Sequence, residues 1–221
     1  MVSYSLWTYV HVLLFVFWLG ADVGVFMAAV YAKNDQLSFE SRATLLKLAG
    51  FIDLFPRVSF ALMLPVGLRL VVLTGIYPVT STIQLISWLV AIAWVALILV
   101  AYVREGSGLA NTLGRIQNIF LIVAGLLFIG LGMLSLANAE PFAQGWFGLK
   151  MLLFGCVFFA ALAIDYCFRP MFAPFMAIGT DGSTPEREAA VTKAINRTLV
   201  SVIALYLLIA AIAFLGTTKP F

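Results

Sequence analysis

The sequence predicts an all-α integral membrane protein, a helical bundle of about six transmembrane helices with both termini outside the cytoplasm. Of its 221 residues, 63% are hydrophobic and only 10% are charged, and the mean hydropathy is +1.08. Soluble domains carry roughly 25% charged residues, so a water-soluble fold is excluded. The net charge of +3 is small and scattered between apolar runs, which argues against a nucleic-acid partner.

Six apolar runs are long enough to cross the hydrocarbon core, which requires roughly 20 apolar residues per helix. No linker between them is long enough to divide the chain, so we expect a single transmembrane domain over residues 1–221. The lipid bilayer is then the main partner of the protein. The predicted spans lie near residues 4–32, 56–77, 83–103, 114–136, 147–169 and 194–215.

The basic residues predict the orientation of these spans. The links after the first, third and fifth spans carry ten of the 13 Lys and Arg residues, whereas the links around 77–84 and 138–145 carry none. Because loops rich in Lys and Arg remain in the cytoplasm, both termini should lie outside. The expected location is the cytoplasmic (inner) membrane of a bacterium, crossed several times.

Two further local patterns indicate helices at the membrane surface. Residues 38–51 alternate polar and apolar positions at helical spacing but are too short and too charged to span, which is typical of an interfacial helix. The segment Ser183-Thr184-Pro185-Glu186 places a cap, an early proline and a glutamate where a helix begins. We therefore expect the sixth helix to start there, before the membrane.

Four ionisable residues fall inside the predicted spans: His11, Asp22, Arg69 and Lys150. An ionisable side chain in the bilayer costs several kcal/mol unless it is paired, so each is a functional candidate. The predicted topology places His11 and Arg69 about two turns below the outer ends of their spans and Lys150 about one turn below Trp146. These three residues predict a polar site in the outer leaflet.

Asp22 and Trp18 share a helical stripe with His11. Asp22 follows His11 by close to three full turns, so it should lie on the same face but roughly 16 Å deeper. We expect Asp22 to form a hydrogen bond within the bundle, and a catalytic role in proton relay is the alternative. Trp18 lies between them and is a candidate to contact a cofactor.

The chemistry of the three outer residues leaves several roles open. His11 is the only histidine, and imidazole is a common haem ligand and proton relay, although an interhelical hydrogen bond is the structural alternative. Arg69 needs an anionic partner such as a carboxylate, a lipid headgroup or a cofactor propionate. Lys150 can serve a site or extend its amino group to the interface.

Two segments carry a resemblance to a known family. His11-Val-Leu-Leu-Phe-Val-Phe-Trp18-Leu-Gly20 resembles the opening helix of the membrane superfamily that contains copper-resistance protein D and the HemJ-type protoporphyrinogen oxidases. Trp146-Phe-Gly-Leu-Lys150-Met-Leu-Leu-Phe154 resembles a later helix of the same superfamily. The resemblance implies that His11 and Lys150 are associated with bound haem b and with activity.

The leading hypothesis is a b-type haem protein with a redox role, either electron transfer with quinone or oxidation of a porphyrinogen. His11 would be the axial metal ligand, with Lys150 beside or opposite it and Arg69 paired to a propionate. A single histidine allows one bis-histidine site only in a homodimer. The alternatives are a permease for copper or a small solute, with Asp22 as the coupling carboxylate, and a structural subunit of a larger membrane complex. Whether the protein is an enzyme, such as a membrane oxidoreductase, is left open.

Overall fold

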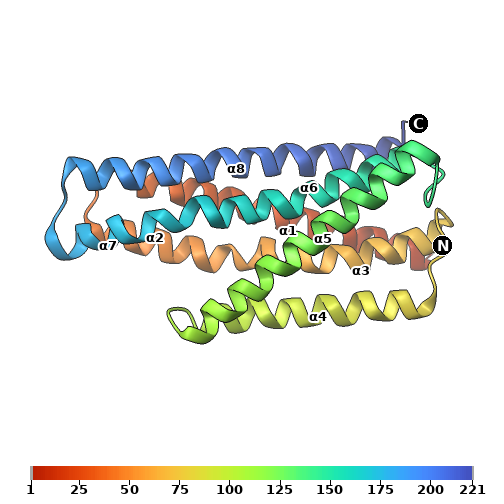
Figure 1. Cartoon of the computed structure of the whole chain (residues 1–221), viewed down its shortest axis with the longest axis horizontal. Coiled ribbons are helices and arrows are strands. Elements are labelled where there is room, and N and C mark those ends of the chain that lie inside the picture. The colour runs from red at the N-terminus through yellow and green to blue at the C-terminus, as the bar shows by residue number, and fades with distance from the viewer. Residues whose placement is uncertain (1, 221) are drawn as a thin grey trace. The chain divides into compact units, whose positions relative to one another are not determined.

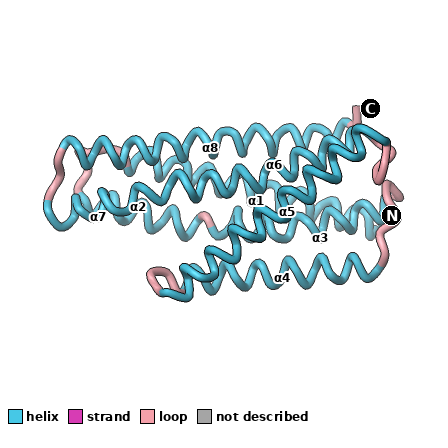
Figure 2. Tube along the Cα trace, viewed as in Figure 1, coloured by secondary structure: helices cyan, strands magenta, loops and turns pink. Residues whose placement is uncertain are grey.

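The computed structural model describes residues 2–220, and every regular element in that range is helical (Figure 1). The connections between helices are short (Figure 2). In chain order the elements are α1 (Val2–Ala32), α2 (Phe39–Ile52), α3 (Leu54–Thr74), α4 (Ser81–Val103), α5 (Gly108–Asn138), α6 (Gly145–Phe168), the 3₁₀ turn η1 (Arg169–Met171), α7 (Phe172–Asp181) and α8 (Pro185–Thr218).

Six helical runs are long and apolar enough to cross a membrane, and each overlaps one of the predicted spans. The predicted all-α fold with six candidate spans is therefore confirmed, and the protein is an integral membrane protein. Which ends face the cytoplasm remains a prediction. The six runs are Val2–Ala32, Phe39–Thr74, Ser81–Val103, Gly108–Asn138, Gly145–Asp181 and Pro185–Thr218.

The local patterns also produce helices where they were expected. A helix, α2, forms over Phe39–Ile52, and a turn at Asp53 separates it from α3. The last helix begins at Pro185, and the Thr184 hydroxyl accepts a hydrogen bond from the Arg187 amide at 3.4 Å. This confirms the predicted start of α8, because a threonine at the N-cap satisfies one of the first backbone amides.

Contacts within the chain define two compact units. Unit 1 comprises residues 1–25 and 50–118, and unit 2 comprises residues 26–49 and 119–221. The predicted single domain is not tested by this division, and the two units are described in turn.

In unit 1, α1 and α3 pack in antiparallel directions. The Trp18 ring stacks on the Phe60 ring with centroids 4.7 Å apart, and Gly24 lies against the side chain of Ile52. Helix α4 joins them, since Phe60 also meets Trp94 edge to face at 5.1 Å. The interior of unit 1 is therefore built on aromatic rings from three helices.

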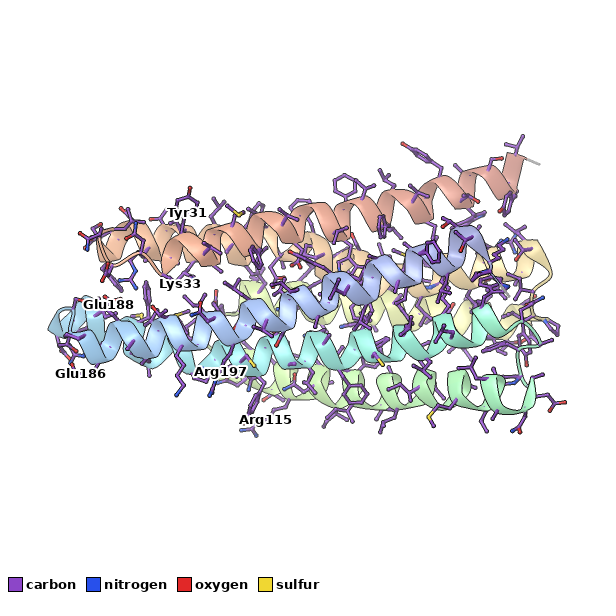
Figure 3. The ribbon with its side chains drawn as sticks, turned by 90° about the horizontal axis from the view of Figure 1, so that it is seen from above. Tyr31, Lys33, Arg115, Glu186, Glu188 and Arg197 are labelled. Atoms are coloured by element: carbon purple, nitrogen blue, oxygen red, sulfur yellow. The ribbon has the colours of Figure 1, made fainter. Side chains whose placement is uncertain are left out.

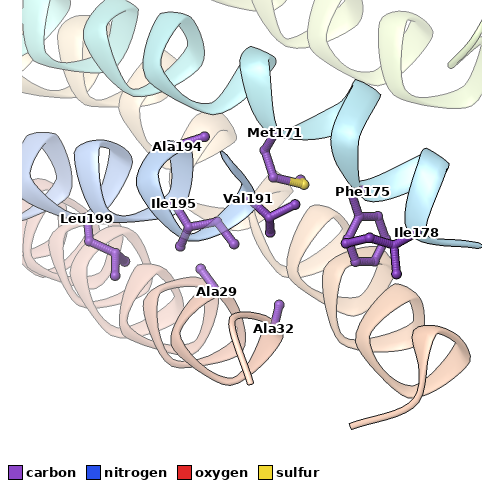
Figure 4. Packing of buried hydrophobic residues seen from close by; sticks show 9 residues of the cluster. All are labelled: Ala29, Ala32, Met171, Phe175, Ile178, Val191, Ala194, Ile195 and Leu199. Atoms are coloured by element: carbon purple, nitrogen blue, oxygen red, sulfur yellow. The ribbon is translucent and has the colours of Figure 1, made fainter. Parts of the chain in front are cut away.

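In unit 2, a hydrophobic core surrounds the beginning of α8 (Figure 4). It is formed by side chains from the end of α1, from η1 and α7, and from α8 itself. Helix α7, which the sequence did not predict, contributes Phe175 and Ile178 to this core, and both are buried. The nine buried members are Ala29, Ala32, Met171, Phe175, Ile178, Val191, Ala194, Ile195 and Leu199.

Arg42 fixes α2 within unit 2 through a buried ion pair. Its guanidinium donates two hydrogen bonds to the Glu188 carboxylate at 2.9 and 2.8 Å, and its Nε donates to the Ala32 carbonyl at 2.8 Å. Only 1% of the Arg42 side chain is exposed. Figure 3 shows Glu188 and Lys33 near the same end of unit 2, where α1 ends and α8 begins, and Lys33 donates a hydrogen bond to Asn196 of α8.

Helices α5 and α6 approach each other closely through glycines. A Cβ at Gly132 would lie 2.5 Å from the backbone nitrogen of Leu152, and a Cβ at Gly155 would lie 2.7 Å from the Gly125 carbonyl oxygen. Small residues at helix interfaces are the usual means of close packing in membranes. Unit 2 is therefore tightly packed along this interface.

Candidate functional site

The imidazole of His11 lies against the backbone of α3. A Cβ placed on Gly67 would be 3.5 Å from Cε1 of His11 and 4.0 Å from its Nδ1, whereas Nε2 is beyond 4 Å. Because Gly67 has no side chain, the ring can approach α3 at this position. The Cε1–Nδ1 edge of the His11 ring therefore faces Gly67.

Two uncharged polar side chains lie close to this position along the helices. Thr8 precedes His11 by about one turn on α1, and Gln84 of α4 donates from Nε2 to the Pro65 carbonyl, two residues before Gly67, at 3.1 Å. Within the described residues, neither the buried Thr8 hydroxyl nor the buried Gln84 Oε1 has a hydrogen-bond partner. Buried polar atoms are normally hydrogen-bonded, and exceptions require an explanation.

Arg69 lies two residues after Gly67 on α3. It is partly buried, and no carboxylate in residues 2–220 forms an ion pair with it. A guanidinium inside an apolar segment is favourable only with an anionic or hydrogen-bonding partner. The requirement for an anion that the sequence indicated for Arg69 is therefore not met by the described chain.

Aromatic rings extend from the histidine along unit 1. Trp7 of α1 meets Trp88 of α4 with centroids 6.1 Å apart, close to Thr8 in sequence. Two turns beyond His11, Trp18 is 5% exposed and stacks on Phe60. Trp18 and His11 both contact α3, so the predicted shared face of α1 is confirmed.

Asp22 is also buried on α1, with 7% of its surface exposed. It follows Trp18 by four residues and therefore continues the same helical face. A buried carboxylate in a membrane helix is consistent both with a hydrogen bond within the bundle and with proton relay.

Lys150 belongs to unit 2, whereas His11, Trp18, Asp22 and Arg69 belong to unit 1. Its amino group lies 2.6 Å from the position that a Cβ on Gly216 of α8 would occupy. The expected pairing of Lys150 with His11 remains a prediction. In the structure, the contact of the Lys150 amino group is with Gly216 of α8.

Sequence reasoning did not identify Thr8, Gly67 or Gln84. Thr8 could have been noticed because it lies three residues before His11, on the same helical face. Gln84 is an amide near the end of an apolar run, a position where polar residues are common. Nothing in the sequence distinguishes Gly67, because the absence of a side chain allows close approach only where another helix packs against that position.

Residues 2–220 contain no cluster of three or more His, Cys, Asp or Glu side chains able to hold a metal ion. His11 is the single histidine of the chain, and a porphyrin would itself supply most of the ligands of an iron bound there. A site for a bare copper ion would require additional ligands.

The sequence matches no family model, and neither a curated protein nor a solved structure matches it. The chemistry of the site is therefore argued from its own residues. It comprises one imidazole in contact with α3 at Gly67, one guanidinium two residues later on α3, two buried polar atoms and several aromatic rings.

Proposed function

We propose that the protein is an integral membrane haem b protein with a redox role, in which His11 supplies the axial nitrogen. The observation that supports this proposal is the packing of the only histidine of the sequence against Gly67 of α3. Imidazole nitrogen is a common axial ligand of haem iron. Bound haem would supply one-electron transfer through its iron.

The other residues of unit 1 have roles that follow from their chemistry. Arg69 would pair a haem propionate, which supplies the anion that the described chain lacks. Trp18 would pack against the macrocycle as an aromatic wall. Asp22, deeper on the same face of α1, would accept or release a proton coupled to electron transfer.

The proposal is also supported by sequence. The His11–Gly20 segment resembles the superfamily of copper-resistance protein D and the HemJ-type oxidases. The proposed partner is a quinone or a porphyrinogen, and the proposed location is the bacterial inner membrane. Because each chain has one histidine, a second histidine ligand would have to come from a second copy in a homodimer.

The decisive experiment is a reduced-minus-oxidised visible spectrum of the purified protein in mild detergent, with a pyridine haemochrome assay. We expect the spectrum of haem b in the native protein and its loss in His11→Ala. Tyr9→Ala is the matched control, because Tyr9 lies on the same helix but is 63% exposed, and this variant should keep the spectrum. Size-exclusion chromatography verifies that each variant is folded.

A second variant tests the contact between His11 and Gly67 and leaves the histidine itself in place. Gly67→Leu would push the imidazole away from α3, because a Cβ alone already reaches ordinary contact at 3.5 Å, so the haem content should fall while His11 is still present. A colourless native protein after haem supplementation, or an unchanged spectrum in His11→Ala, would overturn the proposal. Metal-dependent uptake into vesicles would then indicate the permease, and its absence the structural subunit.

A further inference from the structure

Helices α6 and α8 of unit 2 bring two lysines to one seam. Lys219, which directly follows α8, places its Nζ 5.7 Å from the centre of the Trp146 ring. One turn further along α6, the Nζ of Lys150 lies against Gly216, three residues before Lys219. The two contacts follow one another in antiparallel register, so both ammonium groups lie on the same side of this helix pair.

The position of Lys150 differs from that of a lysine that merely extends to water. Its Nζ would lie 2.6 Å from a Cβ on Gly216, so the amino group occupies the space that any other residue at this position would fill. The absence of a side chain at Gly216 thus forms a seat for the ammonium group against α8. Trp146, 8% exposed, packs edge to face with Phe147 at 5.5 Å and holds one wall of the seam.

The seam has two positive charges and no anion from the described chain. Neither Lys150 nor Lys219 forms an ion pair with a carboxylate of residues 2–220. Lys150 of α6 and Lys219 at the end of α8 carry like charges that repel each other, and the repulsion grows as water is excluded. An anion between them would remove this cost and accept hydrogen bonds from both ammonium groups.

We propose that Lys150, Lys219 and Trp146 form a binding site for a phosphate group at the membrane–water interface. Tryptophan is enriched at the depth of the lipid headgroups, and a lysine there contacts their phosphates. The phosphate can belong to a phospholipid or be free in solution, and both sources present the same oxygens. This site involves only unit 2 residues and does not depend on haem binding in unit 1.

The test measures binding of phosphatidylglycerol to the full-length, delipidated protein in detergent by native mass spectrometry. Lys150→Met and Lys219→Met should each weaken binding about tenfold, the loss expected from one charge-assisted hydrogen bond. Lys47→Met is the matched control, because Lys47 is an exposed lysine of the same unit, and its binding should be unchanged. Lys219 is itself exposed, so Lys219→Met decides the matter if Lys150→Met does not fold.

Two added compounds identify the source of the phosphate. Diacylglycerol has the same tails without phosphate and should bind far more weakly than phosphatidylglycerol. If inorganic phosphate displaces the lipid, the site also takes the free anion, and if it does not, the lipid headgroup is the ligand. Equal binding of diacylglycerol, or unchanged lipid binding in both lysine variants, would overturn the proposal and leave the lysines as stabilisers of the α8 C-terminus.

Discussion

Polar groups in two regions of the molecule differ in whether the described chain supplies their partners. In unit 2, Arg42 is buried but donates to Glu188 and to the Ala32 carbonyl. In unit 1, the buried oxygens of Thr8 and Gln84 have no hydrogen-bond partner within residues 2–220, and Arg69 has no counter-ion there. The difference separates the Arg42 pair, which stabilises the fold, from polar groups that remain able to bind, namely those of unit 1 and the two lysines, Lys150 and Lys219, of unit 2.

The largest effect should follow from breaking the ion pair of unit 2. Glu188→Leu leaves the Arg42 charge buried without its partner, and we expect a loss of about 3–5 kcal/mol of stability. The double variant Arg42→Met with Glu188→Leu should recover most of this loss, because no uncompensated charge remains. Thermal unfolding in detergent measures both variants.

The control for this experiment is the more exposed pair in the same unit, between Arg187 and Asp181. The Asp181 side chain is 61% exposed and its oxygen lies 3.1 Å from Arg187. Surface pairs contribute about 0–1 kcal/mol, so Asp181→Asn should change stability little. Equal losses in Glu188→Leu and Asp181→Asn would show that burial does not distinguish the two pairs.

A smaller effect is expected at the glycine interface between α5 and α6. Gly132→Ala would bring a Cβ to 2.5 Å from the Leu152 backbone nitrogen, and the required shift should cost about 1–3 kcal/mol. Gly130→Ala, on the same helix, meets nothing within 4 Å and should be neutral or slightly stabilising. Thermal unfolding of the two variants is the measurement. Equal stability of Gly132→Ala and Gly130→Ala would show that the interface has room for a methyl group at Gly132.

The smallest effect, and the sharpest comparison, comes from one substitution made in each unit. Thr198 of unit 2 donates to the Ala194 carbonyl at 3.0 Å, so Thr198→Val should cost about 0.5–1.5 kcal/mol. Thr8→Val removes a hydroxyl without a partner and should be neutral or stabilise by about 1 kcal/mol. Unfolding of the purified protein is the measurement, and a clear loss of stability in Thr8→Val would remove the contrast between the units.

The sequence predicted the helices of this protein better than their contacts. Hydropathy identified all six candidate spans, and the Thr184-Pro185 pattern located the start of α8, because both signals are local. Helix α7 was not predicted because it is short, with Pro170 just before it and Pro174 in its first turn, and because its apolar residues are explained only by the core that they enter.

The candidate site was predicted in part. The face shared by His11 and Trp18 follows from helical periodicity, and the packing of both residues on α3 confirms it. The seat at Gly67 and the bond from Gln84 to Pro65 depend on which helices are neighbours and on their register. A single sequence does not contain that information, since membrane helices of similar hydropathy can be arranged in many orders.

The ion pair between Arg42 and Glu188 has a consequence for the synthesis of the protein. The two residues are 146 positions apart, and ribosomes add about 5–20 residues per second, so Arg42 is made roughly 7–30 s before its partner. During that interval its charge must stay in water or in contact with lipid headgroups. Helix α2 can therefore reach its final position only after the last helix has begun to leave the ribosome, and unit 2 is completed at the end of translation, whereas every segment of unit 1 has already been made.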